Sequence, residues 1–197
     1  MKILIVGASG TIGNKVTAAL KGKHEVITAG SKSGELRLDI TSADSIKKFY
    51  DQAGKFDALI STTGSAYLGP LETMTEKEFR KGIDSKLMGQ VNLVLIGQHY
   101  INANGSFTLT SGSLAFDPIA NGTNLSTINA ALNGFVMAAA VDLKNGIRIN
   151  AVCPGVVEDS PAWFEYFPGH IPDKMDAVVA GYVKSVLGAK TGEVIRI

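Results

Sequence analysis

Three glycines near the N-terminus have the spacing of a phosphate-binding turn. They lie in the segment Gly7-Ala8-Ser9-Gly10-Thr11-Ile12-Gly13, which follows an apolar run and precedes an expected helix. A glycine turn lets backbone amides approach a pyrophosphate, and the helix N-terminus adds partial positive charge. A glycine triad alone is weak evidence, but here the strand and the helix that the motif requires are both present. The segment therefore predicts a dinucleotide site, with an ordinary tight turn as the alternative.

The residues after the second expected strand bear on which dinucleotide is bound. That strand ends in Ala29-Gly30-Ser31-Lys32-Ser33, and no acidic residue occurs between Glu25 and Glu35. An acidic side chain there would accept hydrogen bonds from the ribose of NAD and repel the 2′-phosphate of NADP. Lys32 instead supplies a positive charge, and the serines supply hydrogen-bond donors. We therefore expect NADP(H) to be preferred over NAD(H), unless Lys32 is only a solvated loop lysine.

Few other residues are placed for chemistry. Ser111 ends an expected strand, where its hydroxyl could orient a substrate oxygen or serve only in a turn. The three histidines are scattered, and no Cys-x-x-Cys or His-x-x-x-His spacing occurs, so we expect no metal site. The one cysteine, Cys153, excludes an internal disulfide and favours a reducing compartment. We expect it to be a buried, inert thiol.

The elements that must position these residues alternate along the whole chain. This alternation predicts βαβ units, a parallel sheet of about seven strands and helices on both faces, in one Rossmann-type α/β domain over residues 1–197. Thr75-x-x-Glu78 predicts a capping box at the start of the longest helix. The expected strands are 2–6, 25–29, 35–38, 57–61, 106–110, 147–152 and 192–197, and the expected helices are 13–20, 43–52, 76–101, 129–143 and 173–187.

Composition limits the class of partner. The 197 residues are 45% hydrophobic, and 19 basic against 18 acidic residues give a net charge of +1. This balance indicates no nucleic-acid partner and no anionic membrane surface. The uncharged stretch 118–141 begins with polar residues, so it predicts a loop and a buried helix and not a membrane span. We expect a cytoplasmic protein that binds a dinucleotide and an unidentified small molecule.

Several of these segments together resemble the short-chain dehydrogenase/reductase family. The resemblance covers the whole chain: besides Gly7–Gly13, Leu38-Asp39-Ile40 resembles the acid-plus-aliphatic step whose aspartate binds the adenine amino group. Ser61-Thr62-Thr63-Gly64 stands where the family has Asn-Asn-Ala-Gly, and Thr110-Ser111 where its catalytic serine lies. The runs 129–135, 148–155 and 191–194 resemble the catalytic helix, the segment with Pro154-Gly155 beside the nicotinamide, and the last strand. The resemblance implies a Rossmann fold and a nicotinamide cofactor.

The catalytic pair of that family has no counterpart here. In the alignment through the Ala-Ala-Leu run, the family's tyrosine falls on Leu125 and its lysine on Asn129. No tyrosine of this chain is followed by a lysine four residues later. Because the tyrosine transfers the substrate's hydroxyl proton, the family's usual mechanism cannot be assumed. The nearest phenol to a cofactor motif is Tyr67, more simply a surface-loop residue.

A second departure suggests a compensating exchange. The chain has Asp84-Ser85-Lys86-Leu87 where the family has Asp-x-Asn-Leu, so a lysine replaces that asparagine while Asn129 replaces the family's lysine. The resemblance implies that the two positions are close in space. We hypothesise that Lys86 extends its ammonium into the pocket and that Asn129 binds the ribose. The alternative is that Lys86 is a surface residue at a helix kink.

These residues favour two functions, beside which a lyase, epimerase or other chemistry on the same scaffold stays open. One is an NADP(H)-dependent oxidoreductase with a remodelled proton-transfer site containing Ser111, Lys86 and Asn129. The other is a non-catalytic NAD(P)-binding module, such as a redox sensor or regulatory partner. A closed pocket lined by Trp163 or Phe164, from the irregular loop 155–172, would favour the enzyme. Small and apolar residues on the two long helices also predict a homodimer or homotetramer, namely Gly89, Val91, Val94, Gly134, Ala138 and Ala139.

Overall fold

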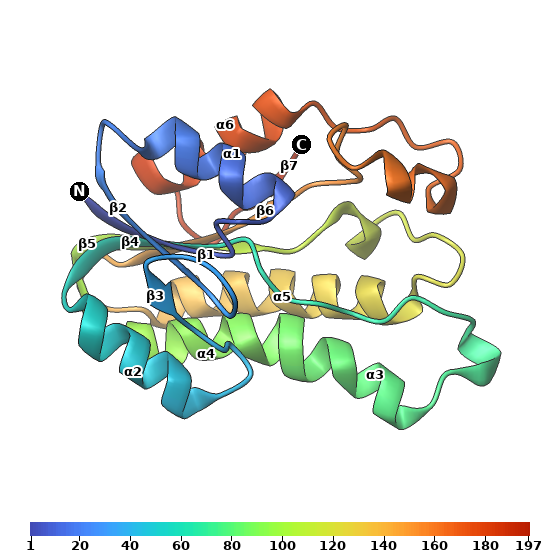
Figure 1. Cartoon of the computed structure of the whole chain (residues 1–197), viewed down its shortest axis with the longest axis horizontal. Helices are drawn as coiled ribbons and strands as arrows, with labels where there is room; N and C mark the ends of the chain where they lie inside the picture. Colours follow the sequence, from blue (N-terminus) through green and yellow to red (C-terminus); the bar gives the residue numbers. More distant parts are fainter.

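A computed structural model describes all 197 residues and shows one seven-stranded sheet. All strand pairs are parallel, in the order β3-β2-β1-β4-β5-β6-β7. Helices α1 and α6 cover one face, and α2, α4 and α5 cover the other (Figure 1). The predicted Rossmann-type doubly wound fold is therefore confirmed. The strands are β1 (Lys2–Val6), β2 (Glu25–Gly30), β3 (Leu36–Arg37), β4 (Phe56–Ser61), β5 (Ile101–Thr110), β6 (Arg148–Cys153) and β7 (Val194–Arg196).

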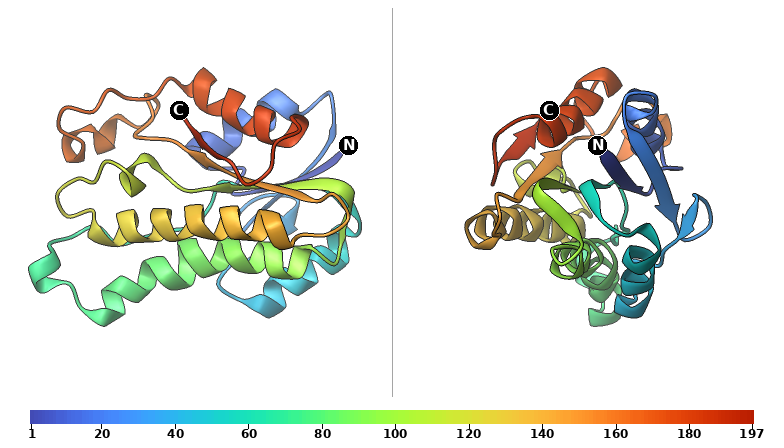
Figure 2. Two further views of the ribbon diagram at one scale, coloured as in Figure 1. Left: turned by 180° about the vertical axis from the view of Figure 1, so that it is seen from behind. Right: turned by 90° about the vertical axis from the view of Figure 1, so that its left-hand side faces the viewer.

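Strand order reverses between β1 and β4. Because the chain crosses to opposite edges of the sheet from these two strands, a crevice opens beyond their carboxyl ends. Figure 2 shows the loops that extend past this edge, away from the N-terminus. The helices are α1 (Thr11–Leu20), α2 (Ala43–Ala53), α3 (Glu76–Gly82), α4 (Met88–Gly97), α5 (Thr123–Asp142) and α6 (Met175–Leu187), with 3₁₀ turns η1 (Leu71–Thr73), η3 (Ser113–Ala115) and η4 (Pro161–Tyr166).

Each face of the sheet has its own core. Alternate residues of β1 point to opposite faces, so Leu4 packs with α2, α4 and α5 while Ile3 and Ile5 pack with α1 and α6. All three are fully buried. A strand buried on both sides has a continuous apolar sequence, as 3–6 does. The two cores hold β1 and β4 rigidly, and therefore fix the loops that follow them.

The longest predicted helix is divided in two. The capping box predicted at Thr75 and Glu78 is present, but the helix passes through one π-helical turn, η2 (Ile83–Leu87), before α4 begins. The helix also ends at Gly97 and not at residue 101 as predicted. Residues 101–105 belong to β5, although the sequence predicted the end of the helix at 101 and a loop at 102–105. A π-turn inserts an extra residue and is common at functional sites. Here it carries Lys86.

Helix α5 begins six residues earlier than the sequence predicted, at Thr123. By length and composition alone, it is the one helix that could cross a membrane. In this fold Ile128, Leu132 and Val136 lie in the core between α5 and the sheet. The helix therefore packs as the predicted buried helix, with its opposite side at the surface.

Candidate functional site

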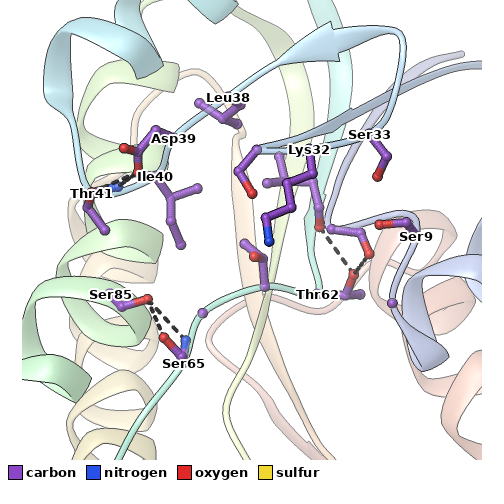
Figure 3. A pocket seen from close by; sticks show the side chains of 17 residues that line it. Ser9, Lys32, Ser33, Leu38, Asp39, Ile40, Thr41, Thr62, Ser65 and Ser85 are labelled. Atoms are coloured by element: carbon purple, nitrogen blue, oxygen red, sulfur yellow. Dashed lines mark hydrogen bonds between the residues drawn. The ribbon is translucent and has the colours of Figure 1, made fainter.

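A polar cavity of about 530 Å³ lies beyond β1, β2 and β4. Figure 3 shows Lys32 extending into it, with Asp39 and Thr41 on one side and Ser9 and Thr62 on the other. Its lining contains eleven residues of the predicted cofactor site: Gly7, Ser9, Gly10, Gly30, Ser31, Lys32, Asp39, Ile40, Thr62, Thr63 and Gly64. The lining also includes Thr41, Ser65 and Ser85, which the sequence analysis did not identify.

The glycine turn has the geometry of a nucleotide cradle. Gly7 has a positive φ of 87°, and a side chain there would press against the Thr62 carbonyl. A Cβ on Gly13 would lie 2.6 Å from the Thr62 hydroxyl, so this glycine allows α1 to approach β4. No side chain caps the N-terminus of α1 at Gly10. Its first amides are therefore free to bind an anion.

Asp39 and Lys32 are the charged residues that line the polar cavity. The Asp39 carboxylate accepts hydrogen bonds from the backbone and the hydroxyl of Thr41, at 2.9 and 2.7 Å, and these bonds lower the pKa of Asp39. They hold the carboxylate ionised at the rim of the cavity. Lys32 is exposed and makes no ion pair with any carboxylate. Its charge is therefore available to a ligand.

A second cavity of about 500 Å³ adjoins the first. The two share Gly10, Thr62, Gly64 and Ser65, so one continuous groove passes the N-terminus of α1. Thr11, Ile12 and Gly155, three more predicted cofactor residues, line this second cavity. Its outer wall is apolar and is formed by Leu68, Leu125, Val156, Val157, Trp163 and Phe167.

Lys86 is the one charged residue that lines the apolar cavity. Its ammonium donates hydrogen bonds to the Ser111 carbonyl at 2.9 Å and to Asn129 Oδ1 at 2.7 Å. Burial lowers the pKa of this ammonium to about 8, because no carboxylate compensates the charge. An ammonium has three N–H donors, so one remains for a ligand. The proximity of Lys86 and Asn129 that the sequence implied is therefore present as a direct contact.

The other two predicted catalytic residues lie behind Lys86. Ser111 and Asn129 are buried, and neither lines the cavity. The Ser111 hydroxyl has no hydrogen-bond partner, whereas its carbonyl is bound to Lys86. Asn129 directs its oxygen at the same ammonium. In this arrangement both residues orient Lys86, and direct contacts with a substrate or a ribose stay predictions.

A buried glutamine fixes the turn that carries Lys86. Gln90 is fully buried, and its amide both donates to the Thr110 carbonyl and accepts from the Thr110 N–H, each at 2.9 Å. The same amide nitrogen donates to the Lys86 carbonyl at 3.2 Å. This residue was not predicted from the sequence. The available signal was an amide side chain, one of two with Asn92, within the otherwise apolar run 87–97, where a buried polar group must have partners.

Gly64 is the other close contact of this turn. It has a φ of 113°, and a Cβ there would lie 2.6 Å from Lys86 Cα. Only glycine lets the loop after β4 pack so closely on the π-turn. Ser85 hydrogen-bonds Ser65 across the same contact. The Lys86 backbone is therefore held against both β4 and β5.

Several other predicted residues lie away from the cavities. Pro154 is buried, and its carbonyl accepts from Ser113 N–H, so it supports the wall without lining it. Tyr67 packs under the Lys81 ammonium outside the cavities, as expected for a residue of a surface loop. Cys153 is buried, and burial raises the pKa of its thiol. In the late loop Trp163 and Phe167 line the cavity, whereas Phe164 does not.

Comparison with known proteins identifies the family. The family described as Enoyl-(Acyl carrier protein) reductase matches residues 10–168. This chain belongs to the short-chain dehydrogenase/reductase family. Its structure matches the crystal structure of the protein lin1944 from Listeria innocua with a TM-score of 0.98 and 47% identity, covering 100% of this chain and 99% of that one. These comparisons support the family resemblance that the sequence showed.

Other relatives place the chain among oxidoreductases. A small-chain dehydrogenase in complex with NADPH matches with a TM-score of 0.90 and 27% identity, over 100% of this chain and 96% of that one. The short-chain dehydrogenase/reductase ucsE of Acremonium is 27% identical, over 96% of this chain and 83% of its own length. The hydroxynaphthalene reductase-like protein Arp2 of Metarhizium acridum is 29% identical over 75% of this chain, which spans 59% of the length of Arp2.

Proposed function

We propose that the protein is an NADP(H)-dependent oxidoreductase that acts on a small carbonyl compound or alcohol through a remodelled proton-transfer site. The observation that carries the proposal is Lys86. Its ammonium lies in the wall of the apolar cavity, is oriented by two neutral acceptors and keeps one N–H free. A nicotinamide cofactor supplies hydride chemistry, so the protein must orient the substrate and handle one proton.

The groove supports the cofactor half of this proposal. The glycine turn and the first amides of α1 lie where the two cavities meet, as a pyrophosphate requires. Asp39 would hold the adenine amino group, and Lys32 with Ser31 and Ser33 would hold the 2′-phosphate. Ile12 and Gly155 would flank the nicotinamide. An NADPH complex of a related dehydrogenase is in accord with this assignment.

Lys86 would then take over the proton transfer. In the reducing direction its ammonium gives a proton to the oxygen of the carbonyl group as the carbon receives hydride. In the oxidising direction the neutral amine takes the proton back. A pKa of about 8 suits both steps, because both forms are populated near neutral pH. Ser111 and Asn129 would act by keeping Nζ in place.

The second candidate is a non-catalytic NAD(P)-binding module. It is favoured by Leu125, which stands at the position of the family's tyrosine and presents hydrocarbon to the cavity. A protein that only senses the redox state of the nucleotide needs no acid or base. Both candidates would bind the cofactor at the same site, but only the enzyme would convert a substrate.

The deciding experiment is calorimetric titration with NADPH and NADH, followed by carbonyl reduction read from NADPH absorbance. We expect NADPH to bind at least tenfold more tightly than NADH and to be consumed in the presence of a carbonyl compound. Replacement of Lys86 by Met should lower turnover by about 10²–10⁴-fold with NADPH affinity within a few-fold, as for loss of a general acid. Lys81→Met, at an exposed lysine, is the matched control. Binding without turnover would favour the sensor, and no binding would contradict both candidates.

The exposed side of the two long helices bears on how subunits could associate. We infer a homodimer or homotetramer formed through α4 and α5. Gly89 and Val94 are buried within the subunit, so they cannot contribute to that interface as the sequence suggested. Apolar residues of α5 with helical spacing remain exposed instead, namely Gly134, Met137, Ala138 and Val141.

A cytoplasmic location stays a prediction, to be checked by cell fractionation.

A further inference from the structure

The side chains around Lys86 restrict the kind of carbonyl compound that the site could hold. Beyond the glycine turn, most of the wall is apolar and consists of Leu68, Leu125, Val156, Val157, Trp163 and Phe167. Ser65 and Ser160 add hydroxyls, and no acidic residue lines the cavity. A sugar has more hydroxyls than these side chains and Lys86 can pair, so it would lose hydrogen bonds to water without replacing all of them. Burying hydrocarbon there gains about 25 cal/mol per Å². The wall therefore favours an apolar ligand.

The number of donors restricts the ligand further. Leu125 offers no hydroxyl, so Lys86 is the charged donor that the cavity presents to a reacting oxygen. Two of the three ammonium N–H groups are already bound to Ser111 and Asn129. A single N–H can serve one oxygen, whereas a carboxylate next to the carbonyl group would need a second donor. No arginine or further lysine lines the cavity to supply one.

The late loop adds flat aromatic surface. Its base is fixed by backbone hydrogen bonds from Glu158 N–H to the Asp173 carbonyl and from Asp173 N–H to the Val156 carbonyl. A second tie is the ion pair of Lys15 with Asp159 at 3.0 Å. Above this base, Trp163 is 48% exposed although it borders the cavity. A ligand with a ring could cover the indole and bury this surface.

We infer that the substrate is an uncharged ketone or aldehyde with a cyclic hydrocarbon group, bound with its oxygen on Lys86 and its ring against Trp163 and Phe167. This assignment rests on the proposed function for the reaction, but not for the binding. Polyhydroxylated aldehydes are disfavoured by the same wall, and so is a keto acid whose carboxylate would face Trp163 and Phe167 while its carbonyl group binds Lys86. The reduction would transfer a hydride supplied by NADPH to the carbonyl carbon and the Lys86 proton to its oxygen, giving the alcohol and NADP⁺.

The experiment uses Trp163, the one tryptophan of the chain, as an intrinsic fluorescent reporter. The protein is titrated with 4-methylcyclohexanone, 4-oxocyclohexanecarboxylate and glyceraldehyde, each with and without NADPH. The first two share a ring ketone and differ in charge. We expect the uncharged ring ketone to bind at least tenfold more tightly than the other two. Tighter binding of the keto acid or of glyceraldehyde would overturn the inference.

Two variants locate the binding. Phe167→Ala removes an aromatic side chain from the wall and should weaken binding of 4-methylcyclohexanone about fivefold or more. Phe164→Ala removes one from the same loop that does not line the cavity, and should change binding less than twofold. Equal effects of the two variants would contradict the assigned position. Because the titration is also read without NADPH, a failure of NADPH to bind would count against the proposed function alone.

Discussion

At the scale of single residues, the site depends on a lysine that has polar neighbours but no counterion. Lys86 is held by a carbonyl and an amide oxygen, which orient its ammonium without fully compensating the charge. Burial of such a charge favours the neutral amine and brings the pKa of Lys86 from its ordinary 10.5 to about 8. A carboxylate at the same place would have raised that pKa. The neutral partners therefore keep the lysine able to give and take a proton.

The pH dependence of turnover should report this lysine. Reduction needs the ammonium, so its rate should be constant below pH 8 and fall about tenfold per pH unit above it. Oxidation of the alcohol needs the amine, so its rate should rise over the same range. Arginine stays charged over this pH range, so the remaining reduction rate of Lys86→Arg should no longer fall above pH 8. We call this fall the basic limb of the pH profile. Steady-state kinetics in both directions would check this, and an unchanged limb in the arginine variant would contradict it.

The same shift has a consequence for stability. The folded-state pKa of Lys86 lies below the ordinary value of 10.5, so the unfolded chain holds this proton more tightly. As the pH falls from 10.5 through 8, this group therefore destabilises the fold. Lys86→Met removes this penalty but leaves the Ser111 carbonyl and Asn129 Oδ1 without their donor, so the two effects should roughly cancel and Tm at pH 7 should change by no more than a few degrees. A fall in Tm of more than a few degrees at pH 7 would show a structural role instead.

The choice of cofactor should depend on Lys32. Lys32→Glu places a carboxylate where the 2′-phosphate is expected, so NADPH affinity should fall by about tenfold or more while NADH affinity changes little. Lys23→Glu makes the same charge change on an exposed residue at the amino-terminal edge of the sheet and is the control. Calorimetric titration of both variants with both cofactors is the measurement. Equal losses for NADPH and NADH would refute the role of Lys32.

At the scale of elements, the sequence predicted the strands and helices that local patterns determine. The run 2–6 and the spacing of Gly7, Gly10 and Gly13 sufficed for β1, its turn and α1. The π-turn at 83–87 could not be predicted in this way, because residues 76–97 have a continuous helical pattern. The turn coincides with a tertiary contact, in which the buried Gln90 amide binds Thr110 in β5 and the carbonyl of Lys86. Such contacts join residues far apart in sequence.

Replacement of Gln90 should therefore uncouple Lys86 from β5. Gln90→Leu has a similar volume but leaves the Thr110 N–H unpaired, which costs about 1–3 kcal/mol and lowers Tm by several degrees. We expect kcat to fall about tenfold and the basic limb of its pH profile to move, with NADPH affinity within twofold. Gln98→Leu, at the exposed end of α4, is the control for the substitution itself. A lower Tm with unchanged kcat and pH profile would make Gln90 purely structural.

At the scale of the whole molecule, the groove is assembled from distant parts of the chain at one edge of the sheet. Its lining runs from Val6 to Phe167, and the loops after β1, β2, β4 and β6 all contribute to it. Family spacing allowed most of these positions to be predicted, because each follows a recognisable strand. Leu68 and Phe167 were not predicted as lining, since loops without a periodic pattern reveal no direction. The division into one polar and one apolar cavity likewise appears only when the loops are packed together.

The outer side of the two long helices should be the surface through which subunits associate. On α5 the exposed residues Gly134, Met137, Ala138 and Val141 recur at intervals of three and four, and on α4 Met88 and Leu95 are exposed two turns apart. Val141 is 81% exposed and continues this row of exposed apolar residues. Such a continuous apolar surface is unusual where only water is in contact with it. Met137→Glu should therefore shift the mass in multi-angle light scattering to that of the monomer, because it places a charge within an apolar contact. Leu187→Glu makes the same kind of change on exposed α6 and should leave the mass unchanged. If the original protein is already a monomer, association is excluded. If only Leu187→Glu shifts the mass, the association surface lies elsewhere.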